Sequence, residues 1–425
     1  MIAFITRLLS KYRTVNWALA DQAMVSGTNF FTGLLLARYM GLEEFGVFTL
    51  VWIAILLLSN LQLAMVISPM MSIGPKQTCD EAPAYYGAMF LTQILFSAIS
   101  FLLLFVGITI SGMFFPQWQV QHLALPLASV AFFFQMQDFI RRYFFASNCA
   151  TYAFANDAIS YLGQLVILIW LLKATALNSA GALWIIAGTS ALAALVGSFY
   201  LGKLSWDSRI FYSSTERHFQ FSKWLSISAF MQFGAVNYFI LVAASLWGPS
   251  AAGALKATQN IIGVTHILFQ GLYNVVPPEA SRRYQQEGIR GVLIYLRKIS
   301  WLGGGATTII ALLIGVFSEL WLNLVYGEEF VSYGYILKWY AIIYVLAFFS
   351  VPLHTWFRVL EYTQPIFWAT LSMLLFSLSS ANILSELWGL HGTIIGIFMS
   401  FILLQIILVV AVYRKYKEIM VVNLK

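Results

Sequence analysis

The segment between residues 252 and 277 is mostly apolar, yet polar side chains recur through it at helical spacing. Successive members are 3, 1, 3, 3, 4 and 4 positions apart, namely Lys256, Gln259, Asn260, Gly263, His266, Gln270 and Asn274. On one helix they would share about a third of the circumference. Because polar groups facing lipid are costly, the stripe predicts the lining of a cavity that binds substrate. The alternative is that the amides hydrogen-bond neighbouring helices.

An acidic residue, Asp21, shares one predicted helix face with Thr28 and Thr32. A carboxylate in a low-dielectric setting has a strong reason to bind a proton or a cation, so Asp21 is a candidate ion-coupling residue. The alternative places Asp21 near the cytosolic interface, where it would pair with Arg13 or Lys11.

Two cations, Arg38 and Lys256, lie near the outer ends of their predicted spans. Long basic side chains at such positions can reach the lipid headgroups and serve as anchors. If both point into a central cleft instead, they form a paired cationic site suited to a pyrophosphate, with bidentate contacts from arginine and a point charge from lysine.

Two charged clusters lie at the cytosolic ends of predicted spans. One contains Gln135, Asp138, Arg141, Arg142 and Asp157, and the other contains Glu279, Arg282 and Arg283. Such clusters are typical of an intracellular gate made of ion pairs, and the alternative is a solvated group of charges at the membrane interface. The candidate gate residues are Asp138, Arg142, Asp157, Glu279 and Arg282.

The sequence offers no other reaction chemistry. It has no nucleotide-binding loop, no zinc-binding cluster and no nucleophile elbow. We therefore predict no catalytic residue, no cofactor and no metal site. Without a nucleotide-binding loop, any transport by this chain must draw its energy from a source other than nucleotide hydrolysis.

The elements that position these residues are membrane-spanning helices. Hydrophobic residues make up 60% of the 425 and charged residues 10%, whereas soluble chains carry roughly 25% charge. Runs close to the ~20 residues that cross a bilayer predict spans at 16–38, 47–69, 86–110, 122–145, 154–172, 181–201, 223–247, 252–277, 298–318, 335–357, 365–385 and 391–413. The predicted fold class is an all-α integral membrane protein of about twelve transmembrane helices.

The distribution of basic residues predicts the orientation. With the N-terminus inside, twenty of the 24 Lys and Arg residues fall on the cytosolic side, as the positive-inside rule requires. Both termini are therefore predicted to be cytosolic. The net charge of +7 reflects this orientation and needs no nucleic-acid partner.

A polar interruption between residues 203 and 223 divides the chain into halves, 1–212 and 213–425, of six spans each. Shifting one half by 207 positions superposes Trp17 on Trp224, Gly27 on Gly234, Ala37 on Ala244, Gly41 on Gly248 and Gly46 on Gly253. Because six is even, both halves enter the membrane from the same side, so the repeat is parallel. This layout predicts two pseudo-symmetric six-helix lobes around a central cavity.

Two stretches resemble a known family. Residues 20–50, ADQAMVSGTNFFTGLLLARYMGLEEFGVFTL, resemble the first hairpin of polysaccharide (O-antigen or exopolysaccharide) flippases in the multidrug/oligosaccharidyl-lipid/polysaccharide exporter superfamily. Residues 254–284, ALKATQNIIGVTHILFQGLYNVVPPEASRRY, resemble the eighth helix and following loop of the same proteins. The twelve-span layout matches over nearly the whole chain, and the motifs indicate the superfamily more firmly than the cargo.

The resemblance implies a transporter of the bacterial cytoplasmic (inner) membrane that carries an undecaprenyl-pyrophosphate-linked oligosaccharide to the outer leaflet. Its implied partners are the lipid bilayer, the lipid-linked oligosaccharide, and the polysaccharide polymerase with its chain-length machinery. By the same resemblance, Arg38 and Lys256 would hold the pyrophosphate, and Asp21 would couple the cycle to a proton or sodium gradient. Related flippases for peptidoglycan precursors have fourteen spans and a more basic cavity, so this chain departs from them.

Two other functions stay open. A multidrug exporter of the same superfamily should favour acidic over basic cavity residues, and Lys256 and Arg38 argue mildly against it. A membrane polymerase or ligase of lipid-linked sugars should have a large outer loop with catalytic Arg or His residues, which this sequence lacks.

Overall fold

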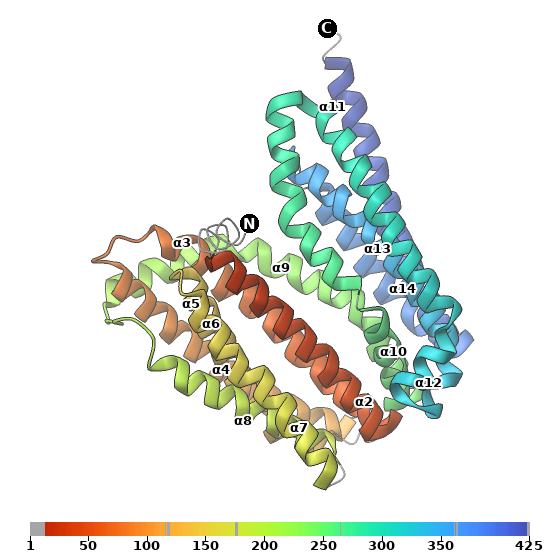
Figure 1. Ribbon diagram of the computed structural model, residues 1–425, viewed down its shortest axis with the longest axis horizontal. Coiled ribbons are helices and arrows are strands. Elements are labelled where there is room, and N and C mark those ends of the chain that lie inside the picture. Colours follow the sequence, from red (N-terminus) through yellow and green to blue (C-terminus); the bar gives the residue numbers. More distant parts are fainter. Residues whose placement is uncertain are drawn as a thin grey trace, which may run out of the picture. The chain divides into compact units, whose positions relative to one another are not determined.

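A computed structural model describes the backbone of residues 13–422, apart from 115, 117–119, 175–176, 264, 361 and 363 (Figure 1). Some side chains inside these helices also lie outside the described part. Every regular element in the described ranges is helical. In the apolar core of a bilayer no water can hydrogen-bond the backbone, and a helix pairs each backbone N–H and C=O group within its own segment. The predicted all-α membrane fold is confirmed.

Nine helical segments of the described chain are long and apolar enough to cross a membrane. Two of them, Ala20–Met71 and Gln364–Ile419, are long enough to cross twice, and each contains a glycine at positive φ, Gly41 (79°) and Gly389 (57°). The predicted eighth span is divided between two helices, of which the first ends at Ile262 and the second begins at Thr265. Counting the two double segments twice and adding this divided span accounts for all twelve predictions.

The chain forms two compact units, Met1–Phe230 and Met231–Lys425. The first contains α2 (Arg13–Gln62), α3 (Ser68–Ile73), α4 (Ala82–Phe114), α5 (Ala124–Ala146), α6 (Ala150–Asp157), α7 (Gly163–Ala174), α8 (Ser179–Ser198) and the start of α9 (Ser208–Trp247). Two π-helical turns, η1 (Leu63–Ile67) and η5 (Ala158–Leu162), interrupt these helices. Helix α5 packs against both α4 and α8, so its polar residues are brought inside the unit.

The second unit contains the rest of α9, then α10 (Pro249–Ile262), α11 (Thr265–Val316), α12 (Ser318–Tyr326), α13 (Gly334–Val359) and α14 (Gln364–Val422). Here α13 packs against α11 and α14. The division between the units falls within α9, and the predicted boundary at 212/213 lies nearer the start of the same helix. That predicted lobe boundary stays a prediction.

The predicted internal repeat has a counterpart in the backbone. Gly41 and Gly248, which the 207-residue shift superposes, have nearly the same unusual conformation, with φ/ψ of 79°/171° and 82°/177°. The same shift relates the 3-10 turns η4 (Gln121–Leu123) and η6 (Glu328–Tyr333), which precede α5 and α13. Each half therefore turns its chain at the same points.

Candidate functional site

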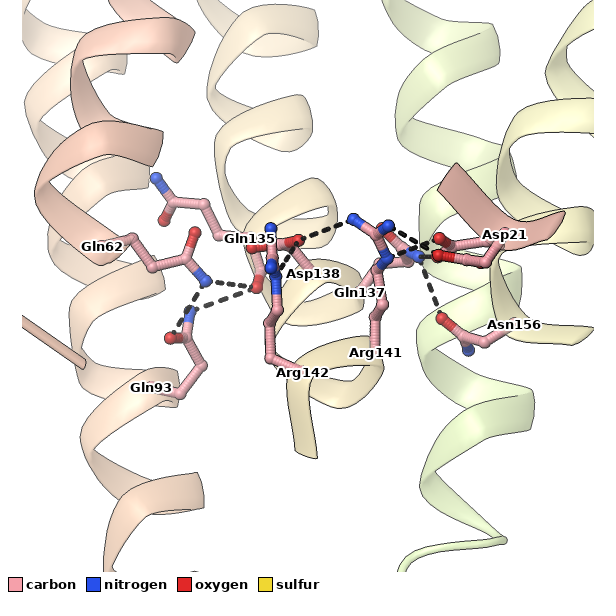
Figure 2. A network of polar contacts seen from close by, with 10 residues as sticks. Asp21, Gln62, Gln93, Gln135, Gln137, Asp138, Arg141, Arg142 and Asn156 are labelled. Atoms are coloured by element: carbon pink, nitrogen blue, oxygen red, sulfur yellow. Dashed lines mark hydrogen bonds and ion pairs between the residues drawn. The ribbon is translucent and has the colours of Figure 1, made fainter. Parts of the chain in front are cut away.

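A single guanidinium in the first unit bridges carboxylates from two other helices (Figure 2). Nη2 of Arg141, on α5, donates to Oδ2 of Asp21, on α2, over 2.7 Å. Nε of Arg141 lies 2.6 Å from Oδ2 of Asp157, at the end of α6. The second contact is ionic and not a hydrogen bond, since neither atom has a hydrogen-bond partner among the described residues.

This group is withdrawn from the surface of its unit. Asp21 and Asp157 are 0% exposed and Arg141 is 6% exposed. Oδ1 of Asp21 has no hydrogen-bond partner among the described residues. A buried ion is tolerated only when it is paired with an opposite charge. Here two carboxylates share one guanidinium, so the second negative charge raises the free energy of the folded protein.

Neutral side chains hold Asp157 in place. Nε2 of Gln137 donates to Oδ1 of Asp157 over 2.7 Å and to Oδ1 of Asn156 over 2.9 Å. Nδ2 of Asn156 donates in turn to the carbonyl of Ala193, on α8, over 2.7 Å. The π-helical turn η5 begins directly after Asp157, and such turns are frequent at functional sites. The carboxylate is thus held by α5, and the neighbouring Asn156 ties its helix to α8.

A second ion pair flanks the buried group. Oδ1 of Asp138 lies 3.4 Å from Nε of Arg142 and 3.7 Å from Nη1 of Arg141, and both Asp138 and Arg142 are partly exposed. Three carboxylates therefore face two guanidiniums, which leaves one excess negative charge when all five groups are ionised. A proton or a monovalent cation bound at Asp21 or Asp157 would cancel this charge.

An uncharged polar cluster lies nearby on α2, α4 and α5 (Figure 2). Nε2 of Gln62 donates to Oε1 of Gln93 over 3.2 Å and to the carbonyl of Gln135 over 2.7 Å. The side-chain amide of Gln135 is buried, and neither of its polar atoms has a partner among the described residues. The first unit thus contains amide groups still able to bind a polar ligand or water.

The predicted face of the first span lies inward, since Asp21, Thr28 (3% exposed) and Thr32 (6%) are all buried. The observed partner of Asp21 is Arg141, which sequence analysis placed only in the gate cluster and not among the site residues. The available signal was the Arg141-Arg142 pair, which begins three positions after Asp138 and is followed by Asp157 near the start of the next span. The partner itself lies 120 positions from Asp21.

In the second unit, Lys256 is partly buried on α10, and its Nζ donates to Oε1 of Gln259 over 3.0 Å. No carboxylate lies within 4.0 Å of this ammonium among the described residues. The side chain of Asn260 hydrogen-bonds Tyr326, as the helix-linking alternative expects. Lys256 is therefore a partly buried amine with no carboxylate partner in the described part of the chain.

The stripe does not run along one uninterrupted helix, because Gly263 forms a turn between α10 and α11. A helix interruption of this kind is compatible with the local sequence, since glycine is a poor helix former. The side chains of His266, Gln270 and Asn274 lie outside the described residues. Their place in the cavity lining stays a prediction.

The remaining predicted residues are distributed over both units. Arg38 is exposed on α2 of the first unit, whereas Lys256 belongs to the second, and their pairing stays a prediction. Glu279 lies 3.3 Å from Nε of Arg283, one turn further along α11. The side chain of Arg282 lies outside the described part, so the second gate cluster is only partly described.

Comparisons with known proteins give the fold. The MatE family model matches residues 225–383, which is less than half of the chain. An inward-facing multidrug resistance MATE family transporter of the MOP superfamily is similar with a TM-score of 0.73 and 15% identity, over 91% of this chain and 93% of that one. The lipid II flippase MurJ, in an inward closed conformation, has a TM-score of 0.68 and 14% identity, over 94% and 87%.

A third similar structure is a MOP superfamily transporter from Pyrococcus furiosus, with a TM-score of 0.64 and 14% identity, over 93% of this chain and 94% of that one. The reverse polarity of the binding pocket in that protein suggests a different function for it. No curated protein matches the chain. At these identities the likeness concerns the fold alone. The chain is thus a multi-pass membrane protein with the two-lobed fold of MATE and other MOP-superfamily transporters.

Proposed function

We propose that this chain is a secondary transporter that uses the group Asp21–Arg141–Asp157 to couple cargo movement to a proton or sodium gradient. The observation that carries the proposal is the single buried guanidinium shared by two buried carboxylates. We place the protein in the bacterial cytoplasmic membrane with both termini cytosolic, and we assign it no enzymatic step.

The coupling follows from the charge of this group. With both carboxylates ionised, Arg141 is held to α2 and to α6 at once. When one carboxylate takes up a proton, its attraction to the guanidinium falls and the net charge of the site becomes neutral. The two protonation states therefore favour different packing of α2, α5 and α6, and a gradient that biases protonation biases the conformational cycle.

For the cargo, the chain's own residues favour an anionic lipid-linked oligosaccharide. Lys256 is a partly buried cation without a carboxylate neighbour among the described residues, and an uncompensated cation in a membrane protein favours an anionic ligand such as a pyrophosphate. The lipid tail could stay in the bilayer while only the polar head crosses. Polymerase and chain-length proteins would be the downstream partners.

A second candidate is a cation-coupled multidrug exporter, and the comparisons support it at least as well as the flippase. The MatE model covers α10 and much of the second unit, and multidrug MATE transporters are prominent among the similar structures. The excess negative charge in the first unit also suits an exporter that exchanges a cation for a cationic or aromatic compound.

Deleting the gene in its host separates the two candidates. Loss of a flippase should trap lipid-linked repeat units on the cytosolic leaflet, whereas loss of a drug exporter should leave them unchanged and raise drug sensitivity. Complementation with Lys256→Ala and with Lys203→Ala, an exposed lysine of the segment between α8 and α9, then tests the cationic site. Trapping with Lys256→Ala but not with Lys203→Ala supports an anionic cargo, and equal activity of the two variants contradicts it.

A further inference from the structure

The second unit has an apolar groove between α11, α13 and α14 that the transport cycle above does not use. Its volume is about 810 Å³, within the range of sites that bind lipophilic molecules. Along α11 its lining extends from Leu293 to Ile309, which at 1.5 Å per residue is about 24 Å. The groove therefore covers most of the ~30 Å apolar core of a bilayer.

Close packing of small and aromatic residues shapes the groove. A Cβ on Gly303 would lie 2.4 Å from the ring of Phe348, and one on Gly304 would lie 3.0 Å from Phe349, so these glycines let α11 and α13 approach each other. A Cβ on Gly305, by contrast, meets nothing within 4 Å. Gly305 thus opens onto the groove, where the missing side chain leaves room for a ligand.

The outer wall of the groove is apolar and faces away from its unit. Trp301 and Ile309, which line it, are 73% and 62% exposed, and their neighbours Leu302, Leu312 and Leu313 are also exposed. An exposed apolar helix face within a membrane span borders lipid. The hydrocarbon of bilayer lipids can therefore enter the groove from the side.

One end of the groove is cationic. Arg297 lines the groove, is exposed, and has no ion-pair partner among the described residues. Arg414 lies at the same end, just beyond the lining residue Val412 of α14. Trp301, one turn from Arg297, belongs to the residue type that marks membrane interfaces. A basic residue in a pocket between transmembrane helices binds anionic lipid headgroups.

A buried donor adds a second polar feature. Trp356 lines the groove from α13 and is 2% exposed, and its indole Nε1 has no acceptor among the described residues. Buried donors without a partner are rare in proteins. Gln405, in contrast, already donates to the Leu346 carbonyl and to Ser350 Oγ, each over 2.7 Å.

From this geometry we infer that the groove binds an anionic phospholipid of the bilayer, with an acyl chain beside Gly305 and the phosphate at Arg297. On the predicted topology this is a lipid of the cytosolic leaflet. The site would tie α11, α13 and α14 together and would make the second unit depend on anionic lipid. The inference does not rest on the coupling group or on the identity of the cargo.

Lipid retention by the full-length purified protein tests this. The protein is exchanged into mixed micelles holding equal amounts of phosphatidylglycerol and phosphatidylcholine, repurified in detergent alone, and the retained lipids are quantified by mass spectrometry. Wild type should retain phosphatidylglycerol in preference. Arg297→Gln should reduce that retention about fivefold, the effect of one basic residue near an anionic surface, whereas Lys298→Gln, its exposed neighbour outside the groove lining, should leave it unchanged.

A second variant tests the acyl-chain position. Gly305→Leu should abolish retention without unfolding, since a Cβ at this position meets nothing within 4 Å and leucine favours helix over glycine. Gly107→Leu, an equally open helical position in the first unit, is the control. Equal retention of both lipids, or unchanged retention in Arg297→Gln and Gly305→Leu, overturns the inference. Recovery of a polyprenyl phosphate in place of phospholipid also overturns it, because the groove would then hold cargo.

Discussion

Asp21 and Asp157, from helices α2 and α6, contact the same guanidinium at 2.7 and 2.6 Å. Both carboxylates are fully buried, so neither charge is screened by water. Their shared dependence on Arg141 makes the protonation of one carboxylate depend on the charge of the other. A bound proton or sodium ion would change the forces among three helices at once.

Asp157→Asn and Asp21→Asn should each uncouple transport. Either amide keeps the shape of the side chain but removes the excess negative charge, so a proton or sodium ion loses its reason to bind. We expect gradient-driven cargo uptake in proteoliposomes to fall at least about tenfold, a change of about 1.4 kcal/mol. Glu216→Gln, an exposed carboxylate of α9, is the control and should retain uptake. Full coupling in both aspartate variants would remove the proposed role of this site.

Arg141→Leu should destabilise the protein, because it leaves two buried carboxylates without a cation. Removing one partner of a buried ion pair typically costs 3–5 kcal/mol, and we expect a loss of about 3 kcal/mol in unfolding free energy. Combining Arg141→Leu with Asp157→Asn should recover part of that loss, since one of the stranded charges is gone. Thermal unfolding of the purified variants measures this, and purely additive effects would mean that Arg141 and Asp157 do not interact.

Gly248→Ala should destabilise the protein through the backbone alone. Its φ/ψ of 82°/177° lies in a region open essentially only to glycine, which costs another residue about 2 kcal/mol, and a Cβ there meets nothing within 4 Å. Gly41→Ala, at the repeat-related position, should lower the midpoint of thermal unfolding by a similar amount. Gly27→Ala is the control, because that glycine lies in regular helix with open space around it. A Gly248→Ala midpoint equal to that of Gly27→Ala would argue against this view of the repeat.

Much of the fold could be predicted from the sequence because its causes are local. The length of the apolar runs alone predicts most of the spans. The spacing of Asp21, Thr28 and Thr32 predicts that they share one helix face, and all three side chains are buried. The Gly41 and Gly248 match was used only as evidence for a repeat, and the structure gives the two glycines nearly the same conformation.

What could not be predicted depends on helix packing. No spacing rule relates Asp21 to Arg141, because their contact depends on how α2 and α5 lie side by side. The lipid groove likewise depends on three helices from separate parts of the second unit. The interruption at Gly263 was missed because one glycine inside an otherwise regular helical pattern is commonly tolerated.

His218 should make the first unit sensitive to acid. Its Nε2 lies 2.8 Å from the Tyr85 hydroxyl, and burial, followed by the nearby charge of Arg217, lowers the pKa of His218 from 6.5 to about 4. Between these two values the unfolded chain binds a proton that the folded chain does not. Stability from this residue is therefore complete above pH 6.5 and is lost as the pH falls toward 4, by up to about 3 kcal/mol.

Thermal unfolding of wild type and His218→Gln, each at pH 7 and pH 5, measures this contribution. The glutamine keeps a polar partner for Tyr85 but cannot take up the proton, so the drop in unfolding temperature between the two pH values should be smaller in the variant. Other groups that titrate in this range contribute equally to both proteins and cancel in the comparison. An equal drop in both would show that protonation of His218 does not oppose folding, and the neutral Tyr85–His218 contact would then lose its role in acid sensitivity.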